Sequence, residues 1–298
     1  MNIIKYKNWF FTLSLVVIMP GIFALFVWGL KLGIDFAGGT LWEIEFSDKE
    51  ISTQTLQTFL EEENVKVTQV TKTGQQTMLV KMFTTDDEEI VKIKQNVGKN
   101  VGEYQDLRLE TVGPTVSREL TQKAFAAVSL SILAILAYIT WAFRKIPKPT
   151  SSLSFGICTI IALVHDVIVV VGIFSILGHF LKIEIDSLFI TALLTVIGFS
   201  VHDTIVVFDR IRENLIKYSE APFEQVVNHS LVQTLGRSLN TSLTAVFVLA
   251  ALFLFGGQSI KNFVLALLIG IISGTYSSIF NAAPLLIVWQ NLKNKKKN

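Results

Sequence analysis

Long apolar stretches separated by short polar segments dominate this chain. Six of them are long enough to cross a hydrocarbon core of about 30 Å, which takes roughly 20 helical residues. They lie near 9–30, 122–143, 153–178, 186–208, 239–256 and 262–289. The fifth stretch is the shortest and is expected to begin earlier, near Thr234. The pattern predicts a polytopic α-helical membrane protein with six transmembrane helices.

The polar region at about 31–120 follows a different pattern. Alternating apolar and polar residues predict strands at 41–46, 65–70, 78–83 and 105–112. A helical period of apolar residues predicts helices at 52–63 and 86–101. The order strand-helix-strand-strand-helix-strand predicts a small α+β ferredoxin-like domain inserted between the first two spans. A domain of about 80 residues can just support its own core.

Basic residues predict the orientation in the membrane, because cytoplasmic loops carry an excess of Lys and Arg. They gather at one set of span ends: Lys5, Lys7, Arg144, Lys145, Lys148, Arg210, Arg212, Lys217, Arg237, Lys293, Lys295, Lys296 and Lys297. The short loops at the opposite ends carry Lys182 and Lys261 alone. Both termini are therefore expected in the cytoplasm, with 31–120 outside and 293–298 as a basic tail that contacts anionic lipid rather than nucleic acid.

Composition agrees with this class of protein. Of the 298 residues, 51% are hydrophobic and 17% are charged, whereas soluble domains carry about 25% charged residues. The single cysteine, Cys158, lies in an apolar stretch, so the external domain must fold without an internal disulfide. No signal-peptidase pattern follows the first apolar stretch, which is therefore expected to remain as a helix.

Ionisable residues inside the predicted spans are the candidates for function, because burying them in lipid is expensive. Asp166 lies near the middle of the third span, beside a histidine, and is either functional or a structural hydrogen-bonding group. Asp203 lies about 7.5 Å inside the end of the fourth span. Arg237 opens the fifth span and can pair with Asp203 or snorkel to the interface. His202 can titrate near neutral pH or serve as a packing donor.

Motifs for metal binding, nucleophilic catalysis and nucleotide binding are absent from the sequence, so the chain is not expected to be an enzyme. No cofactor is expected apart from protons as the coupling ion. Span six carries a seam of small and polar residues for close helix packing. Its members are Gly270, Gly274, Ser277, Ser278 and Asn281. The glycines at 33–40 permit a tight turn after the first span.

Four segments together resemble the SecD/SecF family of protein-export membrane proteins. They are Gly-Ile-Asp-Phe-Ala-Gly-Gly-Thr at 33–40, the segment 112–120, the His-Asp pair at 165–166, and 196–214, which ends in Val-Val-Phe-Asp-Arg-Ile-Arg-Glu-Asn. The resemblance covers about 280 residues, and 196–214 is its most specific part. It implies that the chain has the architecture of SecF, which is similar to half of an RND transporter, and that it lies in a bacterial cytoplasmic membrane.

The resemblance also implies a function and partners. It implies an auxiliary subunit that works with SecD on the SecYEG translocon, with YajC as a further partner. The subunit would use the proton motive force to promote translocation and release of secreted, unfolded polypeptides.

Roles carry over to the positions that match the family pattern. Asp203 matches an intramembrane aspartate tied to proton movement, and Arg237, in Leu-Gly-Arg-Ser-Leu, matches the arginine of the following helix. The structural family motifs match Gly33, Asp35, Gly38 and Gly39 at the base of the external domain, and Asp209 and Arg210 after span four. Two positions depart from the pattern. His202 replaces a common asparagine, which puts the proton affinity around Asp203 in question, and Ala37 replaces a frequent threonine.

Two other functions are compatible with the sequence. A proton-coupled RND-type exporter of small molecules or lipids would carry bound substrate, but its external domains are much larger than 31–120. A scaffold that only stabilises a partner would tolerate substitutions at Asp203 and Arg237. Co-purification with the translocon favours the export hypothesis over the exporter.

Overall fold

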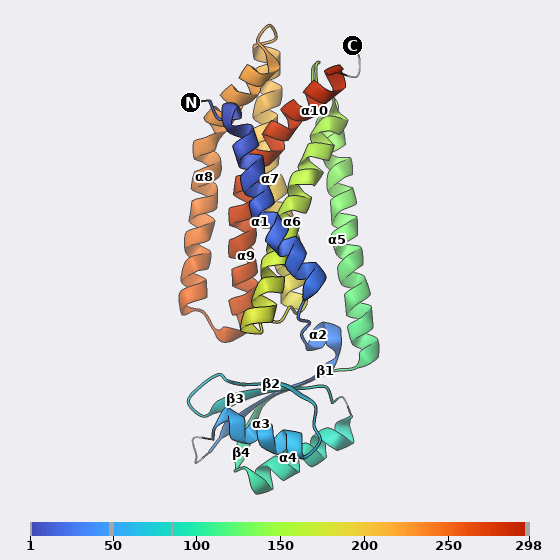
Figure 1. Cartoon of the computed structure of the whole chain (residues 1–298), viewed down its shortest axis with the longest axis vertical. Coiled ribbons are helices and arrows are strands. Elements are labelled where there is room, and N and C mark those ends of the chain that lie inside the picture. Colours follow the sequence, from blue (N-terminus) through green and yellow to red (C-terminus); the bar gives the residue numbers. More distant parts are fainter. Residues whose placement is uncertain (1, 48–50, 85, 296–298) are drawn as a thin grey trace. The chain divides into compact units, whose positions relative to one another are not determined.

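The computed structural model describes residues 2–47, 51–84 and 86–295. It divides into two compact units, one formed by residues 1–31 and 126–298 and the other by residues 32–125. The first is a helical bundle and the second is a small α+β domain (Figure 1).

Six helical spans are long and apolar enough to cross a membrane within the described residues, which confirms the predicted number. The bounds are α1 Lys7–Val27 after a short turn at Ile4–Tyr6, α5 Pro114–Ala142, α6 Ser152–Leu181, α7 Ser187–Lys217, α8 Phe223–Phe255, and a sixth span made of α9 Gln258–Ser277, a π-helical turn Ser278–Ala282 and α10 Ala283–Lys295. The third, fourth and sixth spans are 44%, 50% and 61% buried, whereas α1, α5 and α8 are at most 17% buried. The bundle therefore has α6, α7 and α9 at its centre.

The fourth and fifth spans are longer than the hydropathy pattern predicts. Helix α7 continues to Lys217 instead of ending near 208, and α8 begins at Phe223 rather than near 234. Charged residues lower the average hydropathy there, but Ile211 and Leu231 still pack into the helical core. Arg237 consequently lies well inside α8 and does not open it, which corrects its predicted position.

Close helix crossings occur where glycines face each other across the bundle. A Cβ atom added to Gly172 of α6 would lie 2.6 Å from the Cα atom of Gly21 in α1. Likewise, a Cβ atom on Gly274 of α9 would lie 3.0 Å from the Cβ atom of Ser200 in α7. These contacts bring backbones close enough for short side chains on neighbouring helices to hydrogen-bond.

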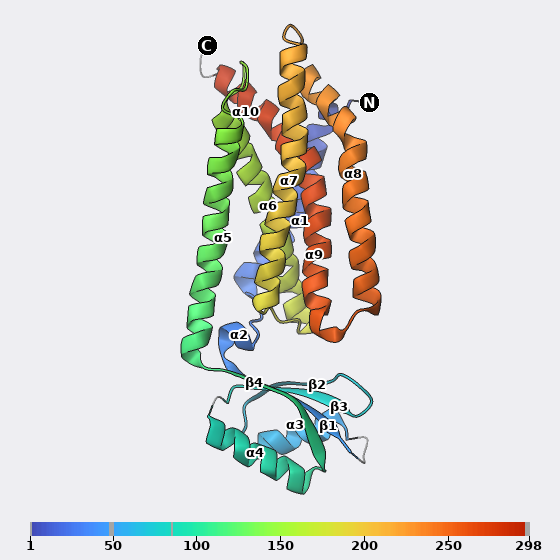
Figure 2. The same ribbon diagram turned by 180° about the vertical axis from the view of Figure 1, so that it is seen from behind.

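The α+β unit has the predicted ferredoxin-like order. After the short helix α2 (Ile34–Ala37), its elements are β1 Gly39–Phe46, α3 Thr53–Glu62, β2 Val67–Lys72, β3 Thr77–Met82, α4 Asp87–Asn100 and β4 Tyr104–Val112. The sheet order is β2-β3-β1-β4 and every pairing is antiparallel. Helices α3 and α4 lie on one face of the sheet (Figure 2). Their first turns are capped by Ser52 and Asp86, which accept hydrogen bonds from the backbone N–H groups of Thr55 and Glu88.

Two of the predicted motif glycines have a clear backbone role at the start of β1. Gly38 and Gly39 have φ angles of +77° and +133°, which side chains with a Cβ atom rarely adopt. A Cβ atom on Gly39 would also lie 2.5 Å from the carbonyl oxygen of Met82 in β3. The glycine pair therefore allows the chain to enter the sheet directly beside β3.

Candidate functional site

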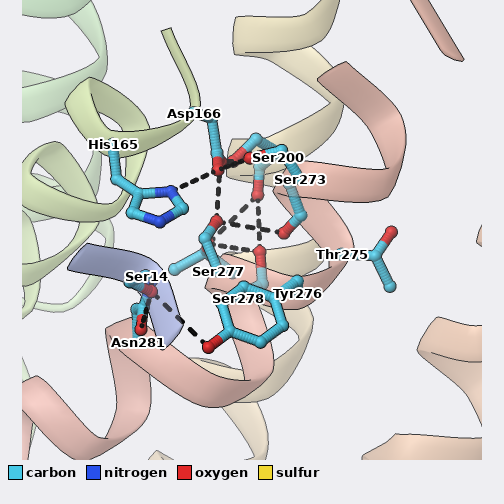
Figure 3. Close-up of polar contacts among 12 residues, drawn as sticks. Ser14, His165, Asp166, Ser200, Ser273, Thr275, Tyr276, Ser277, Ser278 and Asn281 are labelled. Carbon is cyan, nitrogen blue, oxygen red and sulfur yellow. Dashed lines mark hydrogen bonds and ion pairs between the residues drawn. The ribbon is translucent and has the colours of Figure 1, made fainter. Parts of the chain in front are cut away.

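Asp166 of α6 lies at the centre of the helical bundle and is 1% exposed. Its Oδ2 atom accepts hydrogen bonds from the hydroxyl groups of Ser200 and Ser277, each at 2.6 Å. Its Oδ1 atom accepts from Ser273 at 2.7 Å and lies 3.0 Å from Nδ1 of His165 (Figure 3). The carboxyl group thus joins α6 to α7 and α9 through three serine hydroxyl groups and lies beside the histidine of its own helix.

Ser200, Ser273 and Ser277 form a shell of hydroxyl groups around Asp166. Two of them are positioned by the spacing of residues along α9. Ser273 and Ser277 are four residues apart, so they lie on one face of the helix and both reach Asp166. Gly274 lies between them and lets α9 approach Ser200 of α7. Replacing Gly274 with a larger residue would push α9, with Ser273 and Ser277, away from the Asp166 carboxyl group.

Asp203 of α7 forms a second buried carboxyl group, which is 3% exposed. The Ser242 hydroxyl of α8 donates to its Oδ2 atom at 3.4 Å, and Thr275 of α9 donates to the Ser242 oxygen at 2.6 Å. Thr275 points away from the Asp166 cluster in Figure 3. Helix α9 therefore lies between two carboxyl groups, with Ser273 and Ser277 serving one and Thr275 the other.

Arg237 and His202 lie outside this buried network. Both side chains are exposed, and no ion pair joins Arg237 to Asp203 among the described residues. The pair that the sequence allowed is therefore not formed in this structure. The roles predicted for Arg237 and His202 remain predictions.

Polar contacts at the end of α7 join it to α8. Arg210 contacts Glu213 at 2.8 Å and Gln233 of α8 at 2.6 Å, and Asp209 pairs with Arg212 at 2.6 Å. The Asn214 amide donates to Ser230 and to Gln233, each at 2.9 Å. Asp209, Arg210, Arg212 and Asn214 belong to the 196–214 motif, and the contacts of Arg210 and Asn214 with Ser230 and Gln233 connect α7 to α8.

Sequence reasoning identified both aspartates but missed most of their partners. The sequence predicts Ser277 only as a packing residue, and Ser273, Ser242 and Thr275 are not among the predicted candidates. The four-residue spacing of Ser273 and Ser277 in span six is the signal that could have identified Ser273. It does not tell which helix they face.

Comparison with known proteins places the chain in a family. The model for the C-terminal part of the protein export membrane proteins SecD/SecF matches residues 92–292, and the SecD/SecF GG motif matches residues 23–50. The chain belongs to the SecD/SecF family. The GG match includes Gly38 and Gly39, and the other match includes both buried aspartates.

Several members of the SecD/SecF family are similar over nearly the whole chain. The protein translocase subunit SecF of Thermobaculum terrenum is 49% identical over 97% of this chain and 94% of that protein. The SecF subunit of Anaerolinea thermophila is 44% identical over 98% of this chain and 94% of its own length. These relatives are named as translocase subunits and not as enzymes.

A solved structure shares the fold. The crystal structure of SecDF, a translocon-associated membrane protein from Thermus thermophilus, has a TM-score of 0.83 and 34% sequence identity. The match covers 98% of this chain but 39% of that one. The SecDF protein of Bacillus subtilis gives a similar proportion, with 36% identity over 97% of this chain and 38% of its own length. The chain thus spans about two-fifths of these SecDF proteins.

Proposed function

We propose that this chain is an auxiliary subunit of the Sec protein translocase. Together with SecD it uses the proton motive force to promote the translocation and release of secreted polypeptides. The observation that supports proton coupling is a pair of buried carboxyl groups, Asp166 and Asp203, on opposite sides of α9. Two such groups inside membrane spans are the natural sites for proton binding.

Proton binding would change helix packing through the hydroxyl shell. An ionised carboxylate accepts from every hydroxyl that faces it, whereas a protonated carboxyl group donates from one oxygen. When Asp166 takes a proton, the carboxyl group gains an O–H donor, so the hydrogen bonds with the three serine hydroxyls must rearrange. Ser273 and Ser277 both lie on α9, so binding of this one proton changes the attachment of α9 to α6. We infer that this movement is passed to the α+β domain, which contacts the emerging polypeptide.

A SecD partner is supported by two observations. The chain matches about two-fifths of SecDF proteins, in which a part like this chain is joined to further sequence in one polypeptide. In addition, Arg237 is exposed on α8, and lipid is an unfavourable neighbour for a charged side chain. A protein partner at this position of α8 would shield it. The SecYEG channel and YajC are further proposed partners.

The proposed orientation places both termini in the cytoplasm and the α+β domain outside a bacterial cytoplasmic membrane. The distribution of Lys and Arg supports it. In the proposed basic tail, Lys293 and Lys295 belong to α10, whereas Lys296 and Lys297 lie outside the described residues.

The function can be tested in membrane vesicles that carry the chain with SecD and SecYEG. Secretion of a preprotein is measured with and without an imposed proton gradient. Asp203→Asn, Asp166→Asn and Arg237→Ala are expected to abolish the gradient-dependent part while the complex still co-purifies. Glu224→Gln is the matched control, because Glu224 is an exposed carboxylate in the first turn of α8 and pairs with Lys7 at 3.1 Å.

The two outcomes are distinct. Full gradient-dependent secretion in both aspartate variants would remove proton coupling from the proposal. Recovery of the chain with a bound lipid or small molecule, and without SecD or the channel, would instead favour an exporter.

A further inference from the structure

The segment 28–31, which begins directly after the last residue of α1, is bound by side chains of α6. Gly29 turns the chain with a φ angle of +66°. The hydroxyl group of Ser175 in α6 donates to the carbonyl oxygen of Gly29 at 2.6 Å. The Trp28 ring stacks on the His179 ring of α6, with a centroid distance of 4.1 Å and an interplanar angle of 6°. Helix α6 therefore fixes the first residues after α1.

The last residue of this segment is fixed by the loop between α6 and α7. Nζ of Lys31 lies 3.4 Å from Oε1 of Glu184, whose side chain is 6% exposed. The backbone N–H of Ile185 donates to the carbonyl oxygen of Lys31 at 2.9 Å. Gly178 of α6 permits the approach, because a Cβ atom added to it would lie 3.3 Å from Cβ of Lys31. Lys31 is thus held both at its side chain and at its backbone.

Lys31 is the point at which the chain leaves the helical bundle. The α+β unit begins with the next residue, Leu32, and ends at Phe125 in α5. The span that contains α5 is 6% buried, the smallest share among the six spans of the described residues. The bundle therefore holds the chain by specific bonds where it enters the α+β unit, whereas it buries little of the helix by which the chain returns.

The helix that holds this entry also carries Asp166. Helix α6 is continuous from Ser152 to Leu181, and Ser175 follows Asp166 by about 13 Å along its axis at 1.5 Å per residue. Rigid helices and hydrogen-bonded or ion-paired side chains are the elements that carry energetic coupling between distant sites. A displacement of α6 that starts at Asp166 therefore moves the groups that bind the segment 28–31.

We propose that Lys31 and Glu184, with Ser175 and His179, form a latch that fixes the entry of the α+β domain to α6. In this latch Glu184 is a positioning residue for the coupling of proton binding to movement of the domain. The inference rests on the proposed function and assigns to it the residues that pass the movement on. The latch consists of bundle residues alone, and the covalent chain after Lys31 carries the displacement into the domain. Without the latch, the segment 28–31 moves independently of α6 and the displacement is lost.

The deciding variant removes both charges of the latch, as Lys31→Met with Glu184→Gln. Removal of one partner would leave a buried charge without its counter-ion, whereas removal of both is often neutral for stability. The matched control is Lys7→Met with Glu224→Gln, which removes the 3.1 Å ion pair between the starts of α1 and α8. Lys31→Arg keeps the positive charge and should behave like the native chain.

Movement of the domain is measured by pulsed electron paramagnetic resonance in liposomes that contain the full chain with cysteine-free SecD and SecYEG. Spin labels are attached to cysteines at the exposed positions Thr58 of α3 and Ile216 of α7, and the native Cys158 is buried. Asp166→Asn, which imitates the neutral carboxyl group, should shift the distance between the labels. The shift should be lost in the double latch variant and kept in Lys31→Arg and in the control pair.

Secretion driven by an imposed proton gradient gives a second readout. The double latch variant should lose the gradient-dependent part while its unfolding in detergent stays native. Full gradient-dependent secretion or a native label shift in this variant would overturn the inference, as would the absence of any shift in Asp166→Asn alone. If the double variant unfolds more easily, Ser175→Ala replaces it, because it removes only the hydrogen bond to Gly29. A native shift in Ser175→Ala would then overturn the latch.

Failure of the proposed function has a different signature. It requires that Asp166→Asn and Asp203→Asn themselves keep full gradient-dependent secretion. Loss of this secretion in both aspartate variants, together with native secretion in the double latch variant, would overturn the latch alone.

Discussion

The close contact between Gly270 of α9 and Val196 of α7 predicts that a larger residue at position 270 destabilises the helical bundle. A Cβ atom added to Gly270 would lie 2.1 Å from Cγ2 and 2.9 Å from Cβ of Val196. Carbon atoms in contact are normally about 3.5–4.0 Å apart. Val196 is 1% exposed and has no free space to turn into, so the helices must separate. Overpacking of this kind costs about 1–3 kcal/mol, and Gly270→Ala should lower the free energy of unfolding by that amount.

The assay is equilibrium unfolding of the full chain in detergent. Gly198→Ala in α7 is the control, because an added Cβ atom there meets nothing within 4 Å. It should raise stability by about 0.5–1 kcal/mol, because alanine is favoured over glycine in a helix, and the loss at Gly270 is measured relative to this control. A double-mutant cycle with Val196→Ala isolates the contact, since Gly270→Ala should cost less when the two Cγ atoms are gone. Native stability in Gly270→Ala, or strict additivity in the cycle, would refute the reasoning.

Other predictions concern the α+β domain and α8. Trp42 is fully buried and its indole N–H donates to Asp106 at 2.6 Å, so Trp42→Ala should cost about 3–5 kcal/mol in chemical unfolding. Burial, with a smaller effect of the Asp106 charge, raises the pKa of Tyr104 to about 12. The folded domain therefore binds the phenol proton more tightly than the unfolded chain. The resulting stability is complete below pH of about 10 and is lost as pH rises toward 12, and Tyr104→Phe should flatten this loss in alkaline unfolding curves. Arg237→Ala should change thermal stability by less than about 0.5 kcal/mol, because Arg237 is exposed and makes no ion pair in the described part of the chain.

The membrane spans and the ferredoxin-like order could be predicted because their signals are local. Twenty apolar residues in a row, or an alternation along six, are visible without knowing any neighbour. The lengths of α7 and α8 could not be predicted from the sequence. Ile211 and Leu231 pack into the helical core, and this packing outweighs the charged residues near them. The partners of Asp166 depend on where Gly274 crosses Ser200, which is a tertiary contact. For the same reason, the sequence allows an Asp203–Arg237 pair but does not establish one.

The π-helical turn in span six explains how one helix can bind several others at one level. Pro284 lacks an N–H group and its ring clashes with the carbonyl four residues earlier, so a regular helix cannot pass through the turn Ser278–Ala282 undisturbed. At this level Ser277 donates to Asp166 of α6, Ser278 to the carbonyl oxygen of Ser200 in α7, and the Asn281 amide to Ser14 of α1. π-helical turns inside α-helices are frequent at functional sites. The proposed protonation of Asp166 would therefore act on span six beside the point where its regular helix is interrupted.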